Sequence, residues 1–83
     1  MHVYIRWYEN NHPKTQPQRI ESEGEARAAV LARFPAATFS ERTKTIREPT
    51  GSQLTGIDEM MFAWPGPRQP GVYPVADILF PAK

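Results

Sequence analysis

The chain has no cysteine among its 83 residues, and this absence excludes several classes of protein. Disulfide frameworks, cysteine-ligated zinc or iron–sulfur sites and cysteine nucleophiles all require the thiol. A domain of this size without such bonds must be stabilised by packing or by oligomerisation. The absence fits the reducing cytoplasm, where we expect the protein to be found.

Long apolar runs are also absent. No segment approaches the roughly 18 consecutive apolar residues of a membrane helix. The apolar residues at the start of the chain are interrupted by Arg6, too early for the apolar region of a signal peptide. The sequence therefore predicts a soluble, cytoplasmic protein with no membrane partner.

An excess of charge of one sign is lacking too. Ten lysines and arginines against nine aspartates and glutamates leave a net charge of +1. A strongly acidic chain would indicate a nucleic-acid mimic, and a strongly basic chain would indicate a nucleic-acid binder. Overall composition favours neither class.

Recognisable catalytic, cofactor and metal motifs are missing from the sequence. No serine lies in a nucleophile-elbow context, and the glycine-containing segment 66–71 precedes a strand instead of the helix that a phosphate-binding loop requires. Of the two histidines, only His12 can meet Glu9 locally, because an extended strand puts His2 more than about 20 Å from Glu9. We expect a protein that is not an enzyme and that has no catalytic residues, cofactor or metal site.

What the sequence does contain is one well-defined helix at residues 22–34. Ser22 is a favourable N-cap, and Glu25 three residues later completes the capping-box pattern. Pro35 ends the helix, because it has no amide hydrogen and disfavours helical backbone at the preceding residue. The helix is therefore a structural element with clear bounds.

The apolar stripe of this helix is narrow. Residues spaced at about 100° around the axis place Ala26, Ala29, Val30 and Phe34 on one side, with Leu31 at the margin. Small alanines allow a close approach to a sheet. We expect the two largest stripe residues and Leu31 to supply most of the buried area of the helix.

Strands account for most of the remaining chain. The predicted strands are 2–9, 18–21, 36–47, 57–64 and 72–80. The first alternates apolar and polar residues, and the second can return antiparallel to it. The whole chain, residues 1–83, is therefore predicted to be one α+β domain of order ββαβββ. A single helix would pack on one face of an antiparallel sheet of about four or five strands.

Three of these strands carry further expectations. In 36–47 the only large apolar residues, Phe39 and Ile46, have opposite parity, which predicts an edge strand with a bulge. Apolar residues on both faces of 57–64 indicate a central strand. Pro74 lacks an amide hydrogen, so the start of the last strand should lie outside the ladder or at an edge.

The first candidate surface is the polar side of the first strand. Tyr4, Arg6 and Tyr8 alternate there at strand spacing, and four further basic residues could extend the surface: Arg19, Arg42, Lys44 and Arg47. Aromatic rings interleaved with cations on a sheet are typical of single-stranded nucleic-acid binding. The structural alternative is that tyrosine suits strands and that arginine stacks on tyrosine within the chain.

The second candidate surface is the proline-rich loop between the last two strands. Trp64 and Tyr73 flank it, and Arg68 lies near its tip. Rigid loops lose less entropy on binding, and tryptophan, tyrosine and arginine dominate interface energies. The structural alternative is a hairpin stiffened by proline, with Trp64 in the core.

The arrangement of strands, one capped alanine-rich helix and two late strands with an aromatic-rich ending resembles that of several small phage and prophage proteins, including some anti-CRISPR proteins. The segments that carry this resemblance are 22–35, 56–64 and 73–80. The resemblance implies inhibition of a host nucleoprotein complex by occupying its surface, without catalysis. Nucleic-acid-mimicking inhibitors are strongly acidic and this chain is not, so direct contact with a protein is favoured.

Two functions are thus predicted from the sequence. The first is a non-enzymatic protein-interaction module, with partner-binding residues Tyr4, Arg6, Tyr8, Trp64, Arg68 and Tyr73. The alternative is a single-stranded nucleic-acid binder that uses the aromatic and basic sheet face. A single helix covers only one sheet face, so we also expect the uncovered face to favour a homodimer.

Overall fold

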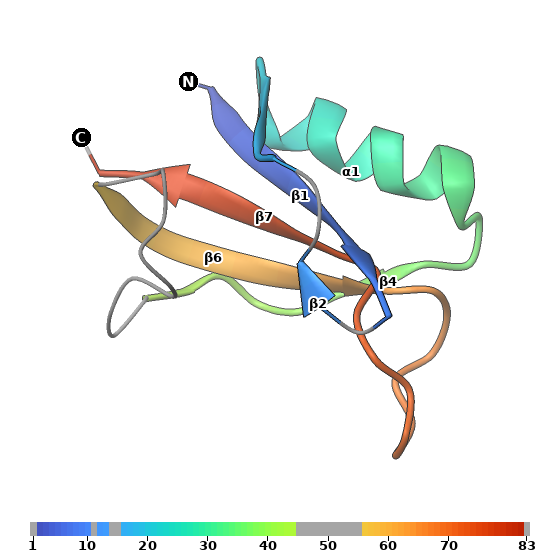
Figure 1. Cartoon of the computed structure of the whole chain (residues 1–83). Coiled ribbons are helices and arrows are strands. Elements are labelled where there is room, and N and C mark those ends of the chain that lie inside the picture. The colour runs from blue at the N-terminus through green and yellow to red at the C-terminus, as the bar shows by residue number, and fades with distance from the viewer. Residues whose placement is uncertain (1, 11, 14–15, 45–55, 83) are drawn as a thin grey trace.

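The computed structural model describes residues 2–10, 12–13, 16–44 and 56–82. Ile46 and Arg47 lie outside the described residues. The elements in chain order are β1 (Val3–Glu9), β2 (His12–Pro13), β3 (Gln18–Ile20), α1 (Glu23–Arg33), β4 (Thr38–Phe39), β5 (Thr43–Lys44), β6 (Ile57–Trp64) and β7 (Ala76–Pro81). They form an α+β fold in which α1 packs on one face of an antiparallel sheet (Figure 1). This confirms the predicted fold class.

The last strand, β7, is the centre of the sheet. It pairs with β1 on one side and with β6 on the other, and both pairings are antiparallel. Beyond them, β2 and β3 pair with β1, and β4 and β5 pair with β6. Five consecutive residues of β7 are buried, which is typical of a strand covered on both faces. β6 is an interior strand, as predicted, but β7 holds the central position.

The predicted hairpin between β1 and the segment at 18–21 is confirmed. Val3 lies opposite Ile20, and Ile5 lies opposite Gln18. The ladder of β7 begins at Ala76, so Pro74 lies outside it, as predicted.

The predicted strand at 36–47 is an edge element that is interrupted. Its described part consists of the two-residue strands β4 and β5. Between them, the Ser40 hydroxyl accepts a hydrogen bond from the Phe62 backbone amide at 2.8 Å. A side chain thus replaces a ladder partner at this point, and Phe39 turns toward the core.

Helix α1 begins and ends where the sequence predicts. The Ser22 hydroxyl accepts a hydrogen bond from the Glu25 amide at 3.2 Å, and Phe34 is the C-cap. Within the helix, Ala26 and Val30 are fully buried. Leu31 was expected to be buried, and this was wrong, because its side chain is 40% exposed. The close approach of the small residues to the sheet covers only the side chains that point directly at it.

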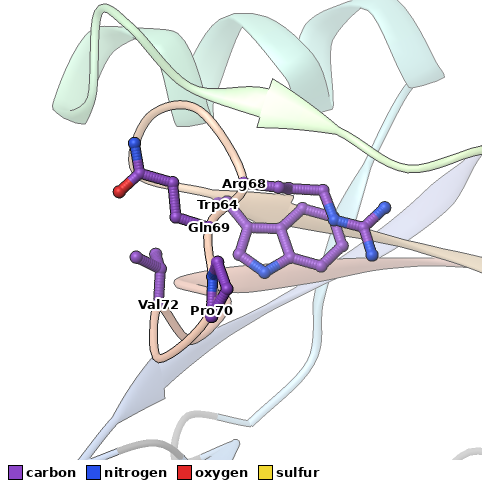
Figure 2. A pocket seen from close by; sticks show the side chains of 5 residues that line it. All are labelled: Trp64, Arg68, Gln69, Pro70 and Val72. Atoms are coloured by element: carbon purple, nitrogen blue, oxygen red, sulfur yellow. The ribbon is translucent and has the colours of Figure 1, made fainter.

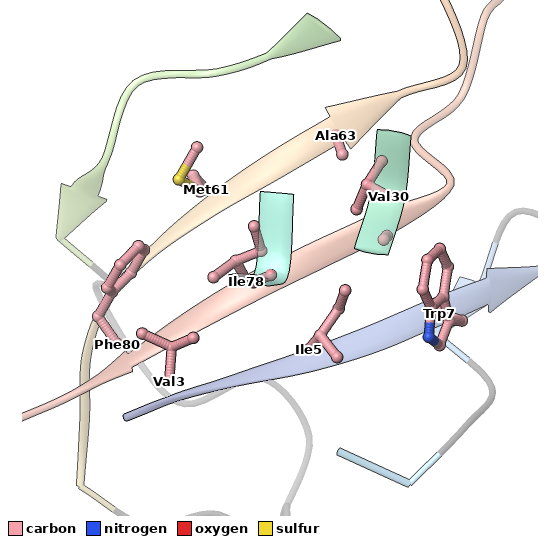
Figure 3. Packing of buried hydrophobic residues seen from close by; sticks show 10 residues of the cluster. Val3, Ile5, Trp7, Val30, Met61, Ala63, Ile78 and Phe80 are labelled. Carbon is pink, nitrogen blue, oxygen red and sulfur yellow. The ribbon is translucent and has the colours of Figure 1, made fainter. Parts of the chain in front are cut away.

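The core lies between α1 and the sheet face beneath it, which we call the helix face. Figure 3 shows side chains from the three long strands meeting Val30 of α1. These strand residues are Val3, Ile5 and Trp7 from β1, Met61 and Ala63 from β6, and Ala76, Ile78 and Phe80 from β7. All point to the same side because alternate residues of a strand share a face.

Arginines cover the aromatic rings at the margin of this core. Arg33 lies over the Trp7 ring and Arg42 lies over the Phe80 ring, each with its guanidinium carbon 3.8 Å from the ring centroid. An eleven-residue helix cannot cover the whole helix face, and arginine shields apolar area while keeping its charge hydrated. Several of the basic residues of the chain are therefore part of the fold.

The packing of α1 gives the first testable prediction. Val30→Ala should reduce the free energy of unfolding by about 1–3 kcal/mol, because it removes fully buried methyl groups and leaves a cavity. The matched control Leu31→Ala, at the neighbouring helix position, should cost less than about 1 kcal/mol because Leu31 is exposed at the margin of the helix and leaves no closed cavity. Urea denaturation measures both values. Equal losses at the two positions would contradict this orientation of α1.

Candidate partner-binding surface

The sheet face turned away from α1, which we call the outer face, carries most of the sequence-predicted binding residues. The pairing of β1, β7 and β6 places Tyr4, Leu79 and Met60 side by side in one row across the three strands. It aligns Arg6 with Asp77 and Phe62 in the next row. Tyr8 and Trp64 continue the same alternation on β1 and β6. The structure therefore brings Tyr4, Arg6, Tyr8 and Trp64 to one face.

A buried ion pair lies in the middle of the outer face. The Arg6 guanidinium donates from Nε to Asp77 Oδ1 at 3.1 Å and from Nη2 to Oδ2 at 2.8 Å. Asp77 is completely buried and Arg6 is 8% exposed. A carboxylate in the central strand needs such a partner, because an unpaired buried charge is strongly destabilising. The two-point contact fixes the plane of the guanidinium.

Tyr8 completes this cluster. Its hydroxyl donates a hydrogen bond to Asp77 Oδ2 at 3.1 Å. Burial raises the pKa of Tyr8 well above its usual range, and the nearby Asp77 charge raises it further. The phenol therefore stays protonated at physiological pH. Arg6 and Tyr8 both bind a carboxylate of their own chain.

Asp77 was not among the sequence-predicted site residues. The signal that could have found it is an acidic residue inside the apolar run 75–80. Such a residue predicts a cation on a neighbouring strand, but the choice of Arg6 requires knowledge of the register. The sequence pattern alone does not supply that register.

The described basic residues of the nucleic-acid hypothesis do not all lie beside Tyr4. Arg42 stacks on Phe80 of the helix face and lies 2.8 Å from the Glu59 carboxylate. Lys44 pairs with Asp58 at 3.4 Å. Arg19 is exposed on β3 opposite Tyr4. Arg47 lies outside the described residues, so only Arg6 and Arg19 can be placed beside the tyrosines.

The outer face itself is largely closed to solvent. Leu79 is 3% exposed and Trp64 is 8% exposed. Tyr4, Tyr8 and Phe62 are half-buried. Among the described residues, the large hydrophobic side chains that are exposed are those of Leu31 and Tyr73, and Tyr73 reaches 57%. The accessible aromatic surface is therefore at the rim of the sheet, in the loop after β6.

Local hydrogen bonds fix this loop. The Gly66 carbonyl accepts from the Thr38 hydroxyl at 2.8 Å, which ties the loop to β4. The Val72 amide donates to the Gln69 carbonyl at 3.0 Å, with Pro70 and Gly71 between them. Gly71 has φ 86°, and the order Pro–Gly with a positive φ at the second position is that of a type II turn. The loop is thus a stiff projection.

Trp64 forms the base of the loop, and Arg68 lies over it. The Arg68 guanidinium carbon is 4.0 Å from the Trp64 ring centroid, and Figure 2 shows the guanidinium extended across the indole. An open hollow of about 370 Å³ lies beside them, lined by Trp64, Arg68, Gln69, Pro70 and Val72. We call these five residues together with Tyr73 the rim surface. Trp64 is both buried, as the structural alternative predicted, and part of this surface.

Within the described ranges, no group of three or more histidine, cysteine, aspartate or glutamate side chains is placed to hold a metal ion. No helix in the described part of the chain is long and apolar enough to cross a membrane.

Comparison of the chain with protein-family models, with curated proteins and with solved structures found no match in any of the three. The resemblance to small phage proteins therefore stays a prediction.

The buried ion pair gives the second prediction. Asp77→Asn should reduce the free energy of unfolding by about 3–5 kcal/mol, because it removes the negative charge that the buried Arg6 guanidinium is paired with. The control Lys44→Gln breaks the exposed pair with Asp58 and should cost less than about 1 kcal/mol. Urea denaturation measures both.

A second variant keeps this prediction testable if Asp77→Asn does not fold. Replacing both charges, with Arg6→Met and Asp77→Leu together, should recover most of the lost stability, because an apolar pair leaves no buried charge unpaired. If the double variant is as unstable as Asp77→Asn, the cost does not come from the uncompensated charge.

Proposed function

We propose that this protein is a non-enzymatic protein-interaction module that binds a protein partner through the rim surface. The observation that carries the proposal is the stiff loop that presents exposed Arg68 and Tyr73 around the buried Trp64. These are the three residue types that most often dominate interface energies. The remaining predicted residues, Tyr4, Arg6 and Tyr8, then support the surface instead of forming it.

Rigidity supports the proposal on energetic grounds. Ordering a flexible side chain on binding costs about 0.5–1.5 kcal/mol, and this cost subtracts directly from affinity. Arg68 is already held against Trp64, and the backbone from Gln69 to Val72 is held by a turn hydrogen bond. Most of the ordering is therefore complete before a partner binds.

The resemblance to small phage-encoded inhibitors that the sequence predicts would make a host nucleoprotein complex the source of the partner. The near-neutral charge of the chain favours contact with a protein component of such a complex over mimicry of its nucleic acid. Inhibition would then follow from occupying a surface, which requires no reaction at the rim surface.

The single-stranded nucleic-acid alternative has less support. Phosphate binding through Tyr4, Arg6 and Tyr8 would require Arg6 to leave Asp77, which is fully buried. Arg42 lies on the other side of the sheet, over Phe80. A homodimer through the outer face is also less supported, because the centre of that face is already largely buried.

The proposed function predicts the effect of charge reversal in the loop. Arg68→Glu should weaken binding to a partner captured from the source cell at least tenfold, because a hot-spot residue is typically worth 2 kcal/mol or more. The matched control Arg19→Glu reverses an exposed arginine beside Tyr4 and should leave the affinity within about twofold. Surface plasmon resonance on the purified pair measures both.

The alternatives make opposite predictions for these variants. Loss of affinity with Arg19→Glu and none with Arg68→Glu would move the binding surface to β1 and β3. Labelled single-stranded oligonucleotides at low salt should show no saturable binding to the wild-type protein. Tight, salt-sensitive binding there would favour the nucleic-acid alternative, because phosphate contacts are strongest at low ionic strength.

A further inference from the structure

We propose that the hollow beside Trp64 binds an acidic segment of the protein partner, with a carboxylate on Arg68 and a neighbouring apolar side chain against Pro70 and Val72. This inference rests on the proposed function and names the chemistry of the ligand. Three observations support it. Arg68 has no carboxylate partner among the described residues, the hollow has an apolar wall, and the Trp64 ring is covered by the Arg68 guanidinium.

Arg68 differs from the three arginines near the sheet that have a carboxylate partner. Arg6 is paired with Asp77, Arg27 with Glu23, and Arg42 with Glu59. Arg68 has no carboxylate within ion-pair distance in the described part of the chain, and its side chain is exposed. Its charge is therefore available to a partner of opposite charge.

The stacking on Trp64 also orients this charge. A guanidinium that lies flat on a ring, here 4.0 Å from the centroid, keeps its N–H donors in a plane parallel to the ring. The donors then point to the edge of the stack, where a carboxylate can accept two of them side by side. Both a phosphate and a carboxylate have two oxygens that can accept these hydrogen bonds. The other residues that line the hollow must therefore distinguish between the two groups.

The walls of the hollow favour a peptide. Pro70 and Val72 supply apolar surface next to the cation, and the Gln69 amide adds a hydrogen-bonding group. A volume of about 370 Å³ is at the lower end of the ~300–1,000 Å³ of ligand sites. This size suits one side chain with its flanking backbone. An acidic residue beside an aliphatic one matches both parts of the hollow.

Nucleic acid fits the hollow less well. A base would bind by stacking on an aromatic ring, but Arg68 already lies over the Trp64 ring, which is 8% exposed. Tracking a phosphate backbone also requires several cations along a groove. Among the described residues that line the hollow, Arg68 is the one cation.

The test is an NMR titration of the ¹⁵N-labelled full chain with two blocked tetrapeptides, N-acetyl-Leu-Glu-Leu-Glu-amide and N-acetyl-Leu-Gln-Leu-Gln-amide. The two tryptophans provide an internal comparison, because Trp7 lies under Arg33 on the helix face. We expect the glutamate peptide to shift the Trp64 indole N–H and the Val72 amide saturably. The Trp7 indole should not move, and the glutamine peptide should bind at least tenfold more weakly.

Variants of the two stacked arginines complete the test. Arg68→Gln should remove the preference for the glutamate peptide, whereas Arg33→Gln should retain it, with unchanged spectra elsewhere confirming that both variants fold. Equal binding of the two peptides, no binding of either, or tighter binding of oligothymidine at the same resonances would overturn the inference. The proposed function is tested separately: it stands if Arg68→Glu abolishes partner binding while the peptides show no preference, and it fails if Arg68→Glu has no effect on the partner.

Discussion

The pairing of Arg6 with Asp77 is the interaction on which the rest of the structure depends. Asp77 is a fully buried charge in the central strand, so β1 must lie beside β7 in the one register that places a cation against it. The same register sends Val3, Ile5 and Trp7 to the helix face, where α1 covers them. The placement of the pair and the placement of the core are thus two consequences of one alignment.

This constraint also bears on where the proposed protein partner would bind. Arg6 and Tyr8 both bind Asp77, so the polar groups at the centre of the outer face already have partners within the chain. The opposite charges of Arg6 and Asp77 also cancel there. Among the described residues, exposed Arg68 and Tyr73 lie at the end of the sheet, where β6 passes into the proline-rich loop. There Arg68 is stacked on an aromatic ring, as Arg33 and Arg42 are at the core margin. Unlike Arg42, it has no carboxylate partner among the described residues.

Local signals in the sequence predicted the elements that depend on near neighbours. Ser22 and Pro35 bound α1, and alternation predicted the two faces of β1 and β6, because capping and strand parity act within a few residues. Long-range pairing was not predictable in this way. The role of Asp77 follows from a contact between residues 71 positions apart. The exposure of Leu31 follows from the rotation of the helix, which turns Ala26 and Val30 toward the sheet. For the candidate site, residue types identified Trp64, Arg68 and Tyr73, whereas only the fold shows that Arg6 is already occupied.

The most direct test of this account compares the side-chain Nε–H resonances of Arg6 and Arg68 in the ¹⁵N-labelled protein before and after saturation with its purified protein partner. Arg6 Nε donates to Asp77, so its resonance should be slow to exchange with solvent and should not shift when the partner binds. The Arg68 resonance should shift and become protected from exchange. A shift of the Arg6 resonance with no change at Arg68 would contradict the account, because the outer face and not the rim surface would then be the site of binding.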